Sequence, residues 1–284
     1  MKSYLLLSFF ILHLALCSAF AEGKLDVAVS ILPQKFLVER IGEDKVSVTS
    51  LVGKGQSPAT FDPTPKQMVE ISNADLFFTI DVPFEKSWIP KIKRSYPKVQ
   101  VINIASEIEP LKDLSEHARE HHASIDPHVW TTPTNAIKLA KTIHDNLTNY
   151  LPSDAELFSR NFKQLSLELE ELDKELAGEL KDVRNRDFFV FHPSWGHFAK
   201  QYGLIQHAIE IDGKEPSAKE LAHIVAEAKQ LGTKTIFIQR EFDTTTAETI
   251  ASAIGAKVEV INPLSEDYIE NLKAATKLIK ESLS

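Results

Sequence analysis

The sequence predicts an α/β protein with two halves of parallel β-sheet and one long helix between them. Two observations carry this prediction. Short β-rich runs alternate with helical patterns on both sides of the middle of the chain. Such alternation predicts parallel sheets with helices on both faces. The middle segment instead repeats apolar residues at helical spacing over about thirty positions, which is too long for an ordinary connection. We find no convincing sequence repeat, only a repeated rhythm of elements.

Each expected element follows from its hydrophobic period and its flanking turn residues. Strands are expected at residues 25–31, 46–52, 75–80 and 99–104 of the first half, and at 188–191, 207–211, 235–238 and 257–261 of the second. Helices are expected at residues 33–41, 65–72, 84–95, 133–150, 195–202, 217–231, 244–254 and 266–283.

The segment between the halves, residues 153–183, is the longest expected helix. Ser153 and Glu156, which follow Pro152, have the spacing of a capping box. About thirty helical residues would span roughly 45 Å, which exceeds the width of a small domain. The segment is either a surface helix or coiled-coil arm, or a rigid strut along both lobes. We favour the strut, which permits small rocking motions rather than wide hinge closure.

The N-terminus has the pattern of a secretory signal peptide. Lys2 precedes an apolar run at residues 5–16, and Ala19 and Ala21 fit a small-residue cleavage site before Glu22. Cys17 follows Leu16, where a lipobox has a small residue, so a lipid anchor at Cys17 is not expected. The predicted division is therefore a signal peptide (1–21), an N-terminal α/β lobe (22–152), a connecting helix (153–184) and a C-terminal α/β lobe (185–284), in an exported, periplasmic or extracytoplasmic protein.

Composition limits the function. The chain of 284 residues has a formal net charge of −8 and no basic face of the kind that binds nucleic acid. Without the signal peptide, 31 basic and 40 acidic residues remain, a net charge of −9, and no cysteine. A metal site in the mature protein must therefore use His, Asp, Glu or water. No His-Glu-x-x-His, Gly-x-Ser-x-Gly or Walker A motif occurs, so we do not expect an enzyme.

Two histidines stand where a ligand would be bound. His128 lies in a loop between an apolar Trp130 and the preceding polar residues, and His192 follows the buried run 188–191 at the carboxyl end of a strand. Open α/β sheets bind ligands at that edge. A single such histidine is more often structural, but two in loops of different halves are expected to face one cleft. His144, His207 and His223 have the surroundings of structural histidines.

Five motifs occur together in the order of a known family. They are Gly-Gln-Ser-Pro-Ala-Thr-Phe-Asp-Pro-Thr-Pro at 55–65, Asp-Pro-His-Val-Trp at 126–130, Phe-His-Pro-Ser-Trp-Gly at 191–196, Gly-Lys-Glu-Pro-Ser at 213–217 and Ile-Asn-Pro-Leu at 261–264. With these motifs the whole mature chain resembles the zinc and manganese solute-binding proteins of ABC transporters, the zinc-uptake periplasmic and adhesin-lipoprotein type.

The resemblance implies two Rossmann-like lobes that hold one metal ion between them. It also implies delivery of a divalent transition metal to an ABC permease by what we expect to be a monomer. The family's four ligand positions correspond here to Ala59, His128, His192 and Asn262. Imidazole at the third position, in place of a carboxylate, favours zinc over manganese.

The chain departs from the family pattern at two ligand positions. Ala59 stands where the family has a histidine, and Asn262 stands where it has an aspartate. Alanine cannot bind a metal, and asparagine is a weak ligand without charge. Three repairs remain open: a ligand from the loop that contains His117, His121 and His122, completion of the shell by water, or a change of cargo to a metal chelate or a non-metal solute. An adhesin or interaction protein without metal binding is a further alternative, and a metallohydrolase is a distant one.

Overall fold

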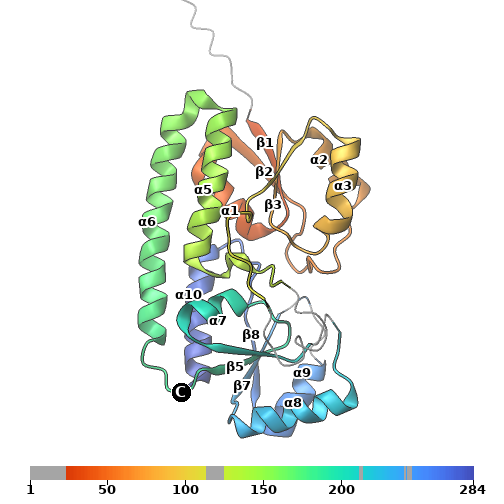
Figure 1. Cartoon of the computed structure of the whole chain (residues 1–284), viewed down its shortest axis with the longest axis vertical. Coiled ribbons are helices and arrows are strands. Elements are labelled where there is room, and N and C mark those ends of the chain that lie inside the picture. Colours follow the sequence, from red (N-terminus) through yellow and green to blue (C-terminus); the bar gives the residue numbers. More distant parts are fainter. Residues whose placement is uncertain (1–23, 113–124, 211–213, 240, 242–244) are drawn as a thin grey trace, which may run out of the picture.

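Two four-stranded parallel sheets form the two lobes of the protein (Figure 1). The computed structural model describes residues 24–112, 125–210, 214–239, 241 and 245–284. The strand order is β2-β1-β3-β4 in the N-terminal lobe and β6-β5-β7-β8 in the C-terminal lobe. The second half thus repeats the topology of the first, although the sequences of the halves show no repeat.

The strands are β1 (Leu25–Val29), β2 (Val46–Ser50), β3 (Leu76–Thr79), β4 (Gln100–Asn103), β5 (Asp187–Val190), β6 (Ile205–Ala208), β7 (Thr235–Ile238) and β8 (Lys257–Val260). The α-helices are α1 (Leu32–Gly42), α2 (Pro65–Asn73), α3 (Glu85–Ser95), α5 (Pro133–Tyr150), α6 (Ala155–Leu180), α7 (Gly196–Tyr202), α8 (Ala218–Gln230), α9 (Thr245–Ile254) and α10 (Tyr268–Ser282). Single 3-10 turns occur at η1 (Glu43–Lys45), η2 (Val129–Thr131) and η3 (Pro152–Asp154).

The predicted fold class is confirmed, and most element boundaries agree within two residues. Strand β6 is an exception, since it occupies Ile205–Ala208 rather than the predicted residues 207–211. The reason lies in the turn before it. Gly203 caps α7 with a left-handed φ of 66°, and Ile205 then pairs directly with Asp187 of β5. A glycine in this conformation ends a helix abruptly, so the strand begins earlier than its hydrophobic pattern indicated.

Helix α6 is the predicted long helix, but it begins differently from the prediction. It has 26 residues, or roughly 39 Å. Its first turn lacks a side-chain cap, and Ser153 donates a hydrogen bond to Asp154 (3.2 Å) instead of closing a capping box with Glu156. The capping-box prediction is therefore wrong. Pro152 starts a 3-10 turn that places Ser153 before the helix, too early to cap it.

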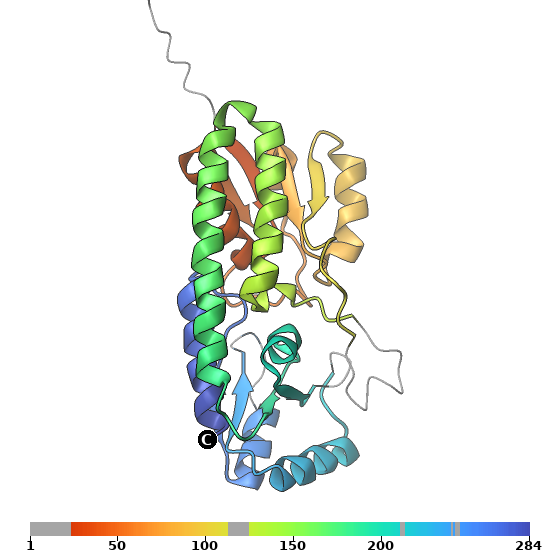
Figure 2. The same cartoon turned by 60° about the vertical axis from the view of Figure 1, so that its left-hand side comes forward.

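Helix α6 packs along both lobes and is not a free arm. Figures 1 and 2 show it beside α5 and extending past both sheets. Its buried side is a stripe of leucines at Leu165, Leu169, Leu172, Leu176 and Leu180. Ion pairs flank the stripe: Arg40 of α1 contacts Glu168 at 2.7 Å, and Lys280 of α10 contacts Glu179 at 2.6 Å. These partners belong to different lobes, so α6 connects the N-terminal lobe to the C-terminal helix.

One hydrophobic core runs through both lobes. Buried Phe78 of the first sheet, Leu172 of α6 and Phe188 of the second sheet belong to the same packed cluster. Phe189 points to the other face of β5, where it joins a smaller core beneath α8 and α9. Alternate strand residues thus pack on the shared core and on a core of the C-terminal lobe alone. The lobes therefore cannot separate without exposing shared apolar surface.

A buried tryptophan joins the loops of the two lobes. The Trp130 indole donates a hydrogen bond to the carbonyl oxygen of Pro263 (2.7 Å), and the Tyr268 hydroxyl donates to the carbonyl of Trp130 (2.6 Å). Trp130 and Tyr268 are almost fully buried. A buried hydrogen bond that is lost leaves an unsatisfied polar group, so this contact resists opening of the lobes.

Among the described helices, none is long and apolar enough to cross a membrane. The predicted signal peptide, residues 1–21, lies outside the described residues.

The leucine stripe of α6 predicts a large stability effect. Leu169 is fully buried, so Leu169→Ala should lower the free energy of unfolding by about 2–5 kcal/mol through lost burial and a cavity. Leu167 on the same helix is 53% exposed, and Leu167→Ala is the matched control with an expected change within about 0.5 kcal/mol. Urea denaturation measures both. Equal losses in the two variants would contradict the assignment of the buried face.

The shared core and α6 also predict how the protein responds to zinc. The radius of gyration measured by small-angle X-ray scattering should be the same, within error, with and without saturating zinc, because wide closure would break the core between the lobes. A clear decrease on addition of zinc would contradict this expectation.

Candidate metal centre

The four positions that the sequence singled out lie in loops that follow strands. Ala59 comes after β2, His128 after β4, His192 after β5 and Asn262 after β8. Because the strands of each sheet are parallel, these loops leave the carboxyl edges of the two sheets. The fold thus places candidate residues from both lobes in the region where the lobes meet.

His128 and His192 lie next to each other although 64 positions separate them. Their ring centroids are 5.2 Å apart, with an angle of 79° between the ring planes. The side chains are 14% and 16% exposed, so both imidazoles are largely shielded from water. His128 also packs edge-on against Trp130, at a centroid distance of 5.3 Å. The ring of Trp130 forms an apolar wall beside the histidine.

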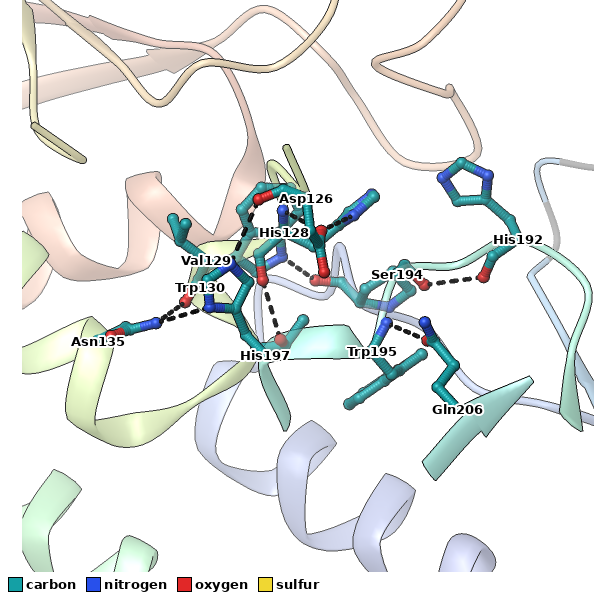
Figure 3. A network of polar contacts seen from close by, with 12 residues as sticks. Asp126, His128, Val129, Trp130, Asn135, His192, Ser194, Trp195, His197 and Gln206 are labelled. Atoms are coloured by element: carbon teal, nitrogen blue, oxygen red, sulfur yellow. Dashed lines mark hydrogen bonds and ion pairs between the residues drawn. The ribbon is translucent and has the colours of Figure 1, made fainter. Parts of the chain in front are cut away.

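Asp126 fixes the position of His128 (Figure 3). One carboxylate oxygen, Oδ1, accepts hydrogen bonds from both the backbone N–H (2.8 Å) and the ring Nδ1 (2.7 Å) of His128. The loop is closed further by Thr131, whose hydroxyl donates to the carbonyl oxygen of His128 (2.9 Å). An aspartate readily forms such a turn with the backbone two residues ahead. The motif Asp-Pro-His therefore folds into a local unit that orients the imidazole.

Glu210, two residues after the end of β6, orients His192 in a similar way. Its Oε2 lies 2.8 Å from Nδ1 of His192, and its backbone N–H donates to the carbonyl of Phe191 (2.9 Å). The Glu210 side chain is only 8% exposed. Each histidine of the pair is thus matched with a buried carboxylate.

The two carboxylates determine which ring nitrogen carries the hydrogen. An ionised carboxylate oxygen accepts a hydrogen bond, so Nδ1 of each ring is the donor. Burial lowers the pKa of His128 below its ordinary value, although the Asp126 carboxylate opposes the shift. Burial works against ionisation of Asp126, but its hydrogen bond and charge interaction with His128 outweigh it and lower the pKa of the carboxyl. At neutral pH the pair is therefore an ionised aspartate and a neutral imidazole, the form that binds metals.

One lone pair of the Asn262 side-chain oxygen is already used in a hydrogen bond. Oδ1 accepts a hydrogen bond from the backbone N–H of Leu264 (2.8 Å), and the Asn271 side-chain amide donates to the backbone carbonyl oxygen of Asn262 (2.6 Å). The second arm of the amide is an NH₂ group, which cannot bind a cation. An aspartate in the same turn would offer a second, free oxygen. This geometry explains in physical terms why asparagine is a poor substitute here.

Among the described candidate positions, Ala59 supplies no ligand. Ala59 is exposed, and its backbone N–H is held by the Ser57 hydroxyl (3.2 Å). His117, His121 and His122 lie outside the described residues. Within the described part of the chain, no group of three or more His, Cys, Asp or Glu residues is arranged to hold a metal ion.

Three further histidines have the structural surroundings that the sequence indicated. His144 on α5 stacks on Phe162 and contacts Ser159 (3.0 Å). On β6, His207 pairs with Asp187 (2.8 Å) and with Glu227 (3.1 Å). His223 lies on α8 and is exposed.

Sequence reasoning missed the residues that orient the two imidazoles. Asp126 is visible in the motif quoted for His128, and its position two residues ahead of a histidine is a usable signal for such a turn. Glu210 is separated from His192 by 18 residues and lies outside every motif, so the sequence contains no signal for this contact. His197 of α7, also missed, contacts the backbone carbonyl of Asp126 at 3.3 Å.

Comparison with protein families decides the assignment. The family described as zinc-uptake complex component A, periplasmic, matches residues 27–282, almost the whole chain. The chain belongs to this family. The resemblance inferred from the five motifs is thereby confirmed, and members of the family are solute-binding transport proteins.

Individual relatives agree with the family assignment. The high-affinity zinc uptake system protein ZnuA of Bacillus subtilis is 31% identical over 294 residues, which cover 94% of this chain and 90% of the relative. The zinc-binding lipoprotein AdcA of Streptococcus pneumoniae strain R6 is 31% identical over 290 residues, but the chain spans only 58% of its length. A crystal structure of ZnuA matches with 36% identity and a TM-score of 0.87, covering 92% of this chain and 100% of that one.

The carboxylate that orients His192 can be tested directly. Glu210→Ala should lower zinc affinity by about 10–100-fold, because an unsupported imidazole loses its fixed orientation and part of its basicity. Glu227→Ala is the matched control: it also removes a carboxylate beside a histidine of the same lobe, but that histidine is His207. Isothermal titration calorimetry with zinc measures both. An unchanged affinity of the Glu210 variant would show that Glu210 does not support the site.

Proposed function

We propose that this protein captures zinc outside the cytoplasm and delivers it to the permease of an ABC transporter. The observation that carries the proposal is the pair of largely shielded histidines from different lobes, with ring centroids 5.2 Å apart and Nδ1 of each ring held by a carboxylate. The names of the relatives, which are zinc uptake and zinc-binding proteins, support the same conclusion.

His128 and His192 are the two strong ligands in this proposal, and Asn262 is a weak third through the second lone pair of its amide oxygen. Zinc prefers four ligands, so water completes the shell unless His121 or His122 supplies an imidazole. The carboxylates of Asp126 and Glu210 contact the two ligand histidines rather than the ion. Their negative charge balances part of the charge of the ion. This arrangement compensates in part for the aspartate that the family pattern has at position 262.

Zinc fits this donor set better than manganese does. Imidazole nitrogen suits zinc, whereas manganese prefers carboxylate, carbonyl and water oxygen. Here both strong donors are imidazoles, and the carboxylates are directed at the histidines rather than at the ion.

The remaining parts of the proposal follow from a carrier role. The cargo leaves unchanged, so the protein performs no reaction. Residues 22–152 and 185–284 form the two walls of the binding site, with residues 153–184 connecting them. The protein acts as a monomer that docks on a membrane permease, after export directed by residues 1–21 and without a lipid at Cys17.

Removal of either strong ligand tests the proposal. His128→Ala or His192→Ala should abolish measurable zinc binding, because two protein nitrogens are the minimum this site offers. His144→Ala on α5 is the control and should bind like the parent. In the parent, affinity should fall as pH falls below about 6.5, since a proton competes for the His128 imidazole, whose pKa burial holds under its ordinary value. Calorimetric titrations from pH 8 to pH 5 provide the measurement, and retained binding in both histidine variants would refute the ligand assignment.

Restoring the family's ligand set tests what the site has lost. The double variant Ala59→His with Asn262→Asp adds an imidazole and a free carboxylate oxygen, so it should bind zinc at least about tenfold more tightly than the parent. Each single variant serves as an intermediate control. If the double variant gains nothing, the site has been reshaped for a cargo other than a bare metal ion.

A further inference from the structure

Gly196, the first residue of α7, lies against the carboxylate of Asp126. A Cβ atom at Gly196 would be 2.4 Å from Oδ2 of Asp126 and 3.5 Å from a methyl group of Leu111. The backbone of Gly196 is not in the left-handed region, so an alanine could adopt its conformation. The position therefore requires glycine for space and not for backbone freedom.

The first turn of α7 surrounds Asp126 on the side that His128 does not occupy. His197 contacts the backbone carbonyl of Asp126 at 3.3 Å, and Gly196 leaves room for Oδ2. On the opposite side, Oδ1 holds the backbone and ring of His128. The backbone N–H of Asp126 is also fixed, since it donates to the carbonyl of Leu111 (2.8 Å). Oδ1 of the carboxylate is thus held by His128, and a side chain at position 196 would strike Oδ2.

The same short segment also carries His192, four residues before Gly196. Figure 3 shows His192, Ser194, Trp195 and His197 following one another along the chain beside Asp126 and His128. One stretch of the C-terminal lobe therefore presents one imidazole itself and shapes the surroundings of the carboxylate that orients the other.

We propose that Gly196 is a positioning residue for the metal site: its bare Cα lets Asp126 of the opposite lobe lie where it can orient His128. This inference rests on the proposed function only in taking His128 as a ligand. It assigns the orientation of the N-terminal ligand to a residue of the C-terminal lobe. The spacing of the two histidines is consequently set by packing in one turn rather than by movement of whole lobes.

A single methyl group is expected to disturb this arrangement. Non-bonded carbon and oxygen atoms pack at about 3.5 Å, so the carboxylate must retreat by about 1 Å from an alanine at position 196. Such a shift breaks the 2.7 Å hydrogen bond to His128. Alanine is otherwise favourable in a helix, so a general effect on α7 would stabilise the protein rather than impair it.

The test combines two single variants and their double variant in calorimetric titrations with zinc chloride. Gly196→Ala and Asp126→Ala should each weaken zinc binding by about 10–100-fold. The double variant should bind like Asp126→Ala alone, because the atom that the methyl group would strike has been removed. Gly178→Ala on α6, where a Cβ would meet nothing within 4 Å, is the control and should bind like the parent. Wild-type affinity in Gly196→Ala, or fully additive losses in the double variant, would overturn the proposal.

A second readout separates this proposal from the proposed function. In zinc-free protein, the Nδ1–H proton of His128 should give a slowly exchanging NMR signal that persists in Gly178→Ala and disappears in Gly196→Ala. If the parent does not bind zinc, the proposed function fails, but this signal still decides the role of Gly196. If Gly196→Ala does not fold, folding of the double variant supports the specific clash with Asp126, whereas misfolding of both overturns it.

Discussion

The hydrophobic core shared by the two lobes is the constraint on which the rest of the structure depends. The first sheet contributes residues of both faces to this core and the second sheet those of one face, and the leucine stripe of α6 lies along it. The outer face of the second sheet has a smaller core of its own. Because the large core is continuous, a change in how the lobes are placed relative to each other would expose apolar surface. The loops at the carboxyl edges of both sheets can then be positioned relative to each other by packing alone.

Hydrogen bonds between the loops of the two lobes add to the contact that the shared core makes. Trp130 packs against His128 and donates to the carbonyl of Pro263, beside Asn262. The loop of the first histidine is thereby attached to the loop of the fourth family position. Tyr268, the first residue of α10, holds the same loop through the carbonyl of Trp130. These contacts are buried, so each would leave an unsatisfied polar group if the lobes moved apart.

At the proposed metal site, two carboxylates each contact an imidazole of a histidine. Buried carboxylates and buried histidines are costly alone, but each pair satisfies both partners with one short hydrogen bond. The result is a pair of oriented imidazoles, each with a carboxylate on its Nδ1 side. In the proposed site, with Ala59 and Asn262 at two of the family's ligand positions, this outer charge would matter more than beside four direct ligands, because little else would compensate the charge of a cation.

The fold could be read from the sequence because its signals are local. Strand runs such as residues 235–238 and the heptad-like leucines of α6 depend on period alone, and the structure confirms both. Errors arose where a neighbouring turn overrode the pattern. Gly203 turns the chain directly from α7 toward β6, so this strand begins before its predicted start. The 3-10 turn after Leu151 places Ser153 ahead of the N-cap position of α6. Boundaries of this kind depend on how the chain turns, which hydrophobic period does not encode.

The sequence by itself determined the family and the alternation of strands and helices, and it singled out His128, His192 and the two altered positions as candidates. Motif order and residue type were sufficient for these, since neither depends on three-dimensional contacts. Only the tertiary structure decided that Glu210 supports His192, that Asp126 packs on Gly196, and that the two imidazoles lie 5.2 Å apart. These contacts join residues from different strands, loops and lobes. Their geometry is set by how the shared core brings the carboxyl edges of two sheets together, and no local pattern in the chain records that packing.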